Sequence, residues 1–212
     1  MRTDRLDRIT DGGVIAILRG VGRDDAVAVA DAVVDAGVTA LEVTADTPNA
    51  MSSIEAIADR VDDALVGAGT VLDAETARAA QLAGAEFLVT PTVNRDVIRT
   101  ANRYGTPIAV GAYTPTEAIE AYEAGADLVK VFPAKTGGPD HVAAIGGPLP
   151  QVPLVPTGGV GAENAGEYVR AGAVAVGVGS GIVDDGAIAD GDFDAIRENA
   201  RAVVEAVSAA WE

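Results

Sequence analysis

A helical pattern gives way to an apolar strand within the stretch Glu123-Ala124-Gly125-Ala126-Asp127-Leu128-Val129-Lys130-Val131-Phe132-Pro133. The glycine of this stretch is typical of a left-handed residue that ends a helix and turns the chain into the next element. The same Ala-Gly pair ends three more helical patterns, within residues 35–38, 82–85 and 170–173. Four copies predict a corner from helix to strand that recurs along the whole chain.

Short runs rich in Val, Ile, Leu and Ala alternate with longer amphipathic stretches, at a spacing of about 20 to 25 residues, the length of one strand plus one helix. Capping residues indicate helix starts in Thr47-Pro48-Asn49, Asp73-Ala74-Glu75, Asn94-Arg95-Asp96 and Thr114-Pro115-Thr116-Glu117. The expected strands span residues 13–19, 38–43, 64–68, 86–89, 107–110, 127–131, 152–155 and 174–178.

Serial strand-helix units without a break in composition predict a single (β/α)8 barrel, the TIM barrel, over residues 1–212. A short helix is expected at the N-terminus, before the first strand. The alternative is an open doubly wound sheet, whose dinucleotide-binding form has a glycine fingerprint after the first strand and an acidic residue about twenty positions later. Arg19-Gly20-Val21-Gly22 does not supply that fingerprint, so we favour the barrel.

The composition excludes several kinds of site. The chain has no cysteine and a single histidine, His141, which rules out disulfides, thiolate nucleophiles and metal centres with several histidines. We therefore expect neither a metal nor a cofactor. No apolar run reaches the length of about 20 residues that a membrane helix needs, and the first residues lack the apolar core of a secretory signal. These features predict a soluble, cytoplasmic protein with no membrane partner.

The net charge is −17, from 15 basic and 32 acidic residues spread along the chain. Such a charge repels nucleic acid and anionic membranes, so we expect neither as a partner. Acidic surfaces that are nearly free of lysine are typical of halophilic proteins, and we expect a host that lives in concentrated salt.

Chemistry in a barrel gathers at the carboxyl ends of the strands. One of the two lysines, Lys130, stands at such an end among apolar residues, where loss of solvation disfavours its charged form. Taken alone, this stretch favours the ordinary explanation, a stem that is covered while the amine reaches water. Strand alternation places Glu42 and Lys130 on faces that meet if both point inward. Glu42 is then either catalytic or one half of a structural ion pair.

Small residues follow the last two expected strands, at Thr157, Gly158 and Gly159 and again at Gly179 and Ser180. Any one of these glycines is explained by a tight turn. Two clusters after the seventh and eighth strands favour a phosphate site, because backbone amides approach an anion closely there.

The chain resembles the 2-keto-3-deoxy-6-phosphogluconate (KDPG) and 4-hydroxy-2-oxoglutarate (KHG) aldolases along nearly its whole length. The resemblance is carried by Ile17-Leu18-Arg19-Gly20, Leu41-Glu42-Val43-Thr44, Val66-Gly67-Ala68-Gly69-Thr70-Val71, Val89-Thr90-Pro91, Val129-Lys130-Val131-Phe132-Pro133-Ala134, Pro156-Thr157-Gly158-Gly159-Val160 and Gly177-Val178-Gly179-Ser180.

The resemblance implies a metal-independent class I aldolase that forms a Schiff base with a phosphorylated keto-deoxy sugar acid and assembles as a homotrimer. It implies that Lys130 forms the imine and that Glu42 is the general acid and base. The other implied roles are lining of the pyruvyl portion by Thr70, Pro91 and Phe132, a cation from Arg19, and phosphate binding by Thr157, Gly158, Gly159, Gly179 and Ser180.

Two positions depart from the family pattern. Asp46 stands where many members have an arginine, and a carboxylate there would repel the substrate's own. Either Arg19 or backbone amides near Thr70 would then bind that carboxylate. Lys135 stands where glutamate is frequent, and we expect it to be exposed. Two other functions remain open. One is an isomerase or synthase of the ribulose-phosphate-binding type, which needs paired Asp and Lys groups, or a magnesium-binding acid, at the strand ends. The other is a non-catalytic sugar-phosphate sensor.

Overall fold

Eight parallel strands pair in the order β7-β6-β5-β4-β3-β2-β1-β8 in the computed structural model, which describes residues 1–211. A parallel bridge between Thr157 and Gly177 joins β7 to β8 and closes the ring. The barrel prediction is confirmed, and the open sheet is wrong. The strands are β1 (Val14–Leu18), β2 (Ala40–Thr44), β3 (Leu65–Gly69), β4 (Phe87–Val89), β5 (Ile108–Ala112), β6 (Leu128–Val131), β7 (Leu154–Pro156) and β8 (Val176–Val178).

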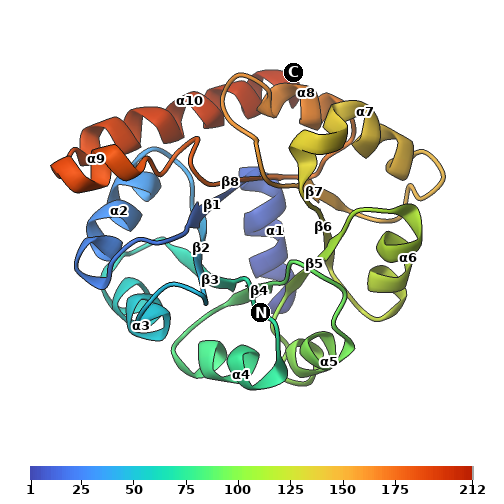
Figure 1. The fold of residues 1–212 in the computed structure, drawn as a ribbon, viewed down its shortest axis with the longest axis horizontal. Helices are drawn as coiled ribbons and strands as arrows, with labels where there is room; N and C mark the ends of the chain where they lie inside the picture. The colour runs from blue at the N-terminus through green and yellow to red at the C-terminus, as the bar shows by residue number, and fades with distance from the viewer. Residues whose placement is uncertain (212) are drawn as a thin grey trace.

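Helices surround the ring of strands (Figure 1). Within residues 1–211, none of them is both long and apolar enough to cross a membrane. The helices are α1 (Arg2–Gly12), α2 (Arg23–Asp35), α3 (Ala50–Arg60), α4 (Ala74–Leu82), α5 (Arg95–Arg103), α6 (Pro115–Glu123), α7 (Ala134–Gly146), α8 (Ala165–Arg170), α9 (Asp185–Asp190) and α10 (Phe193–Trp211).

The repeated Ala-Gly corners have the backbone that their sequence predicts. The four glycines that follow α2, α4, α6 and α8 have φ angles between 97° and 105°: Gly37, Gly84, Gly125 and Gly172. A side chain at this φ is strained, so glycine is the residue that turns each helix directly into the next strand.

Three of the four expected helix caps form as predicted. The side chains of Asp73, Asn94 and Thr114 each accept a hydrogen bond from a backbone N–H in the first turn of the helix that follows. The fourth cap is wrong, although α3 does begin at the expected place. Asn49 has a left-handed backbone (φ 61°) and no capping bond, and the Thr47 hydroxyl instead accepts from the Gly20 N–H.

The interior of the barrel is a small apolar core separate from the larger one between strands and helices. Phe87 is its largest side chain and fits because Gly67 lies opposite, where a Cβ would come within 2.5 Å of the ring. Helix α1 crosses behind the ring in Figure 1 and closes its amino-terminal end, with Ile9 buried against the interior. The short N-terminal helix of the sequence analysis is therefore confirmed.

Salt bridges hold α1 in this position. The Arg2 guanidinium donates to both carboxylate oxygens of Asp127, at 2.9 and 2.5 Å, and Asp127 also accepts from the Ile108 N–H. Arg5 donates to Glu86 at 2.8 Å. The amino-terminal end of the barrel is thus tied and filled, which leaves the carboxyl end for a site.

Candidate active site

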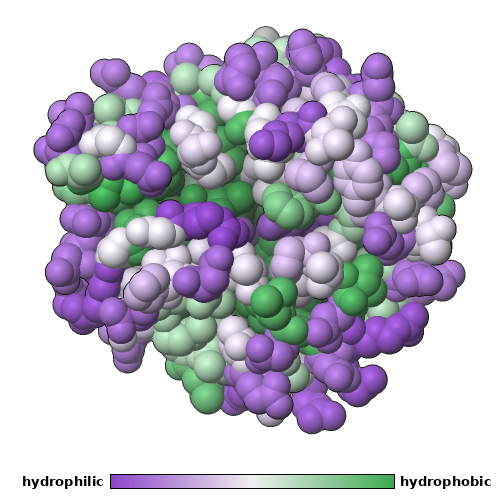
Figure 2. Space-filling model, in the orientation of Figure 1, coloured by the Kyte–Doolittle hydropathy of each residue, from purple (hydrophilic) through white to green (hydrophobic). Residues whose placement is uncertain are grey.

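A cavity of about 540 Å³ opens at the carboxyl ends of the strands. Figure 2, which views this end, shows hydrophobic side chains in a hollow between hydrophilic ones. Ten of the eleven predicted site residues line the cavity, and Glu42 lies deeper. The lining residues are Ile17, Arg19, Thr70, Pro91, Lys130, Phe132, Thr157, Gly158, Gly159, Val160, Gly179, Ser180, Val183 and Asp185.

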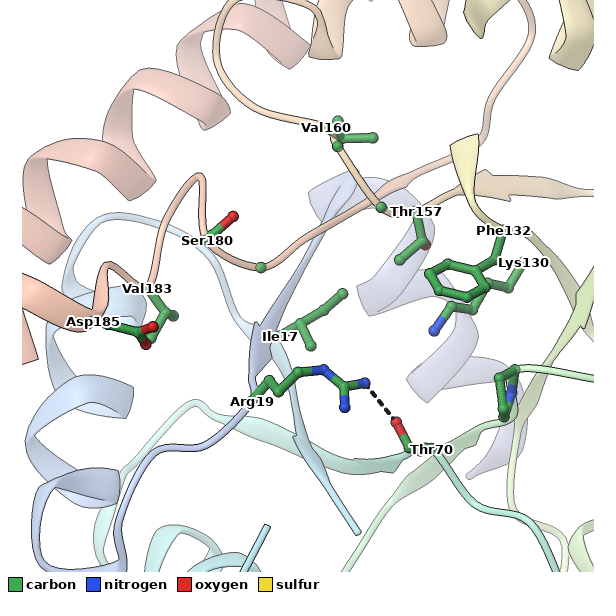
Figure 3. A pocket seen from close by; sticks show the side chains of 14 residues that line it. Ile17, Arg19, Thr70, Lys130, Phe132, Thr157, Val160, Ser180, Val183 and Asp185 are labelled. Carbon is green, nitrogen blue, oxygen red and sulfur yellow. Dashed lines mark hydrogen bonds between the residues drawn. The ribbon is translucent and has the colours of Figure 1, made fainter. Parts of the chain in front are cut away.

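The inward faces of β2 and β6 bring an amine and a carboxyl together. Lys130 Nζ lies 4.0 Å from Glu42 Oε1, and the two side chains are 6% and 2% exposed. The amine also lies 5.2 Å from the centre of the Phe132 ring, within the range of a cation–π interaction. Figure 3 shows Lys130 and Phe132 side by side at the cavity wall. The alternation argument therefore holds for both strands.

The Glu42 carboxyl is buried, and its contacts only partly offset the loss of solvation. Its Oε1 accepts no hydrogen bond from any other of residues 1–211. Burial raises the pKa of Glu42 above its usual value, and the positive charges of Lys130 and Arg19 oppose this shift only in part. A raised pKa suits a group that must both take up and release a proton near neutral pH.

A second cavity of about 10 Å³ lies deeper in the barrel, with Glu42, Lys130 and Thr157 among its lining residues. This volume is at the lower limit for one water molecule, and the surface that faces the cavity is apolar, which does not favour a bound water.

Two glycines give the site its shape, and the sequence analysis assigned a role to neither. A Cβ at Gly69, the last residue of β3, would come within 2.5 Å of Glu42 Oε1. A Cβ at Gly111 in β5 would come within 2.2 Å of the Pro91 carbonyl group. Strand alternation alone indicates that these positions face inward, but it does not reveal which neighbour requires the space.

Arg19 is held from two sides at the end of β1. Its Nη1 donates to Asp46 Oδ2 at 2.5 Å and its Nη2 donates to Thr70 Oγ1 at 2.8 Å. Thr70 has φ 54°, an uncommon backbone for a β-branched residue. Such strained residues cluster at functional sites. Figure 3 shows the Arg19–Thr70 hydrogen bond within the cavity.

Asp46 therefore lies against the guanidinium of Arg19. Burial alone would raise its pKa, but hydrogen bonding from Thr44 and the charge of Arg19 outweigh burial and lower the pKa below its usual value. The carboxyl is ionised at neutral pH and paired with Arg19.

The turns after β7 and β8 expose backbone to the cavity. Gly158 and Gly159 are both left-handed, with φ angles of 91° and 79°. A Cβ at Gly158 would press on the Phe132 ring at 3.1 Å, and one at Gly159 would lie 2.5 Å from Lys135 Cβ. Lys135 is exposed, as expected, and its stem covers Gly159. Backbone N–H groups in such a turn can form a concavity that suits an anion.

Sequence reasoning did not assign four other lining residues, namely Ile17, Val160, Val183 and Asp185. Ile17 precedes Arg19 by two positions, so strand alternation would have placed both on one face. Val160 directly follows the Gly158-Gly159 turn. Val183 and Asp185 come from the loop after β8 and the start of α9, where no local pattern indicates the direction of a side chain.

Comparison with known proteins identifies the family. A profile of the family described as KDPG and KHG aldolase matches residues 6–199. The chain belongs to this family. The 2-dehydro-3-deoxy-6-phosphogalactonate aldolase of Escherichia coli is 42% identical over 169 residues, which are 79% of this chain and 82% of that protein. The 2-dehydro-3-deoxy-phosphogluconate aldolase of Treponema pallidum is 41% identical over 82% of this chain and 83% of its own length.

A solved structure of the KDPG and KHG aldolase family extends the comparison to the fold. KDPG aldolase from Legionella pneumophila, crystallised with pyruvate captured at low pH as a covalent carbinolamine intermediate, superimposes with a TM-score of 0.88 and 32% identity. The match covers 96% of this chain and 99% of that one. These comparisons confirm the family and the barrel fold that we predicted from the sequence.

Proposed function

We propose that this protein is a class I aldolase that cleaves 2-keto-3-deoxy-6-phosphogluconate to pyruvate and glyceraldehyde 3-phosphate through a Schiff base on Lys130. The observation that carries the proposal is a buried amine 4.0 Å from a buried carboxyl oxygen without a hydrogen bond. We include two further substrates in the proposal: the C4 epimer 2-keto-3-deoxy-6-phosphogalactonate, and 4-hydroxy-2-oxoglutarate. All three compounds carry the C2 ketone that the amine attacks.

The chemistry follows from the imine. Lys130 Nζ attacks the C2 ketone, the carbinolamine loses water, and the protonated imine accepts the electrons of the breaking C3–C4 bond. Glu42 takes the proton of the C4 hydroxyl, and the aldehyde product leaves. The enamine of pyruvate that remains is protonated at C3 by the same carboxyl. Hydrolysis then releases pyruvate and restores the amine.

The cavity walls match the rest of the substrate. Thr70, Pro91 and Phe132 would line the pyruvyl portion beside Lys130, and all three border the same cavity as the amine. The phosphate would bind across the cavity, on the backbone amides of Gly158, Gly159, Gly179 and Ser180, with Thr157 beside them. The volume of about 540 Å³ is ample for a six-carbon sugar acid phosphate.

The alternative enzyme class is not favoured. An isomerase or synthase of the ribulose-phosphate-binding type would need paired Asp and Lys groups, or a magnesium-binding acid, at the strand ends. Asp127, which directly precedes β6, is the acidic residue nearest to Lys130 along the chain. Asp127 pairs with Arg2 at the opposite end of the barrel. A sensor without catalysis would have no use for the buried Glu42 and Lys130 pair, which is costly to bury.

The test is reduction with borohydride in the presence of pyruvate, followed by mass spectrometry of peptides. The expected result is one pyruvyl adduct, on Lys130, and none in Lys130→Ala. Lys135→Ala is the matched control, since it removes the other lysine, and it should still form the adduct. An adduct on Lys135, or none in the wild type, would overturn the proposal. Lys130→Ala should also abolish cleavage while its thermal unfolding stays cooperative.

We also propose a cytoplasmic homotrimer. The family resemblance supports the assembly, and a phosphorylated substrate that is retained inside the cell supports the compartment. Light scattering should give about three times the chain mass of 21.3 kDa. A single-chain mass across the micromolar range would contradict the trimer, and recovery in the membrane or secreted fraction would contradict the compartment.

A further inference from the structure

The guanidinium of Arg19 has a defined place in the cavity although the side chain is long and half exposed. Two partners on different strand ends hold it, Asp46 after β2 and Thr70 after β3. In Figure 3 the side chain extends from β1 away from Ser180 and toward Thr70, on the side of Lys130. A free arginine has several rotamers, so this direction needs a cause.

The direction decides which anionic group of the substrate Arg19 meets. The C1 carboxylate is bonded to C2, the atom that joins Lys130, so it must lie close to the lysine. The phosphate is on C6, four carbons further, and the glycine turns after β7 and β8 suit it. A guanidinium held beside Thr70 is therefore on the carboxylate side.

Arg19 keeps capacity for a ligand while it is held. The guanidinium has five N–H donors, and the bonds to Asp46 and Thr70 use two of them. Three donors remain in a planar array that suits a carboxylate.

We propose that Asp46 is a positioning residue, which holds the Arg19 guanidinium beside Thr70 so that Arg19 binds the C1 carboxylate of the substrate. This inference rests on the proposed aldolase function and deepens it. Asp46 does not repel the carboxylate directly, because its charge is paired with Arg19. It acts only through the arginine.

The Asp46–Arg19 pair contributes little to the fold. Its side chains are 51% and 55% exposed, and ion pairs between exposed groups have small effects on stability. Loss of Asp46 should leave the melting temperature within about 2 °C of the wild type. Any change in pyruvate binding then reports on position and not on unfolding.

The experiment measures the pyruvate concentration that half-saturates borohydride trapping on Lys130, together with steady-state kinetics of condensation of pyruvate with glyceraldehyde 3-phosphate. In Asp46→Ala, the half-saturating pyruvate concentration and KM for pyruvate should rise roughly three- to tenfold, the effect of releasing one long side chain. KM for the phosphorylated aldehyde should not change. Asp46→Asn keeps an acceptor oxygen and should recover most of the affinity for pyruvate.

A double mutant tests whether Asp46 acts through Arg19. Arg19→Ala should weaken pyruvate binding at least as much as Asp46→Ala, and adding Asp46→Ala to it should cause no further loss. Asp96→Ala is the matched control, because it removes the acid of another exposed pair, 3.0 Å from Arg99 and remote from the cavity. It should leave both KM values unchanged.

The outcomes separate this inference from the proposed function. Unchanged pyruvate dependence in Asp46→Ala, or a rise only in KM for the phosphorylated aldehyde, would overturn the role of Asp46. Additive losses in the double mutant would overturn action through Arg19. Failure of the wild type to trap pyruvate on Lys130 would instead refute the aldolase proposal itself.

Discussion

Replacement of Gly69 by alanine should disable the site without replacing a reactive group. The new Cβ would lie 2.5 Å from Glu42 Oε1 and 2.7 Å from its Cδ, whereas ordinary contacts begin near 3.4 Å. The carboxyl must therefore move by about 0.9 Å, since the backbone of a central barrel strand yields less than a side chain. A misplacement near 1 Å lowers kcat about 100-fold. Overpacking costs about 1–3 kcal/mol of unfolding free energy.

The assay is the rate of pyruvate release from the phosphorylated sugar acid, with thermal unfolding measured in parallel. Gly67→Ala is the control for overpacking, because its Cβ would meet the Phe87 ring at the same 2.5 Å in the same strand. It should lose comparable stability and keep most of kcat. Gly146→Ala meets only Leu154, at an ordinary 3.7 Å, and should change neither quantity. If Gly69→Ala kept kcat within about threefold of the wild type, the geometric argument for Glu42 would be refuted.

Burial raises the pKa of Glu42 above its usual 4.5, so the folded state keeps a proton that the unfolded chain has lost and stability falls as pH rises through that window. Glu42→Gln should therefore gain stability relative to the wild type as pH rises above 4.5 in urea titrations, and a constant difference would contradict this. Gly159→Ala, strained at φ 79°, should raise KM for the phosphorylated aldehyde about tenfold and leave KM for pyruvate unchanged in the condensation assay. Asp127→Ala leaves Arg2 and the Ile108 N–H without their acceptor and should cost about 2–3 kcal/mol in urea unfolding, whereas Asp127→Asn should cost less. The net charge of −17 predicts that salt raised from about 0.1 to 1 M, which shortens the Debye length from about 10 to 3 Å, should increase the melting temperature; a decrease would contradict self-repulsion as the dominant surface effect.

Local sequence patterns were enough to predict most of the helix-to-strand corners and strand positions. The Ala-Gly corners are left-handed because glycine alone adopts that backbone without strain, a property of the residue itself. Every expected strand end lies within two residues of the observed end, because alternation and helix periodicity depend on near neighbours in the chain. The start of α3 shows the limit of such rules. Asn49 makes no capping bond, and the Thr47 hydroxyl accepts its hydrogen bond from Gly20, in a turn that is distant in the sequence.

The sequence by itself determined the class of fold and the positions at which chemistry gathers, because the carboxyl ends of the strands follow from the order of elements. Lys130 and Glu42 could be named on this basis. Their separation of 4.0 Å could not, because it depends on the closure of the barrel and on the space beside Gly69.

Asp46 gives the sharpest contrast between sequence and tertiary structure. From sequence it was expected to repel the substrate's carboxylate, since its partner is 27 residues away and no local rule pairs the two. Only the pairing of the neighbouring strands β1 and β2 brings Arg19 against Asp46. Only the left-handed turn at Thr70, after β3, supplies the second hydrogen-bond partner of Arg19. The strength of an ion pair depends on the distance between its charges in space. In a barrel, the pairing of neighbouring strands determines that distance.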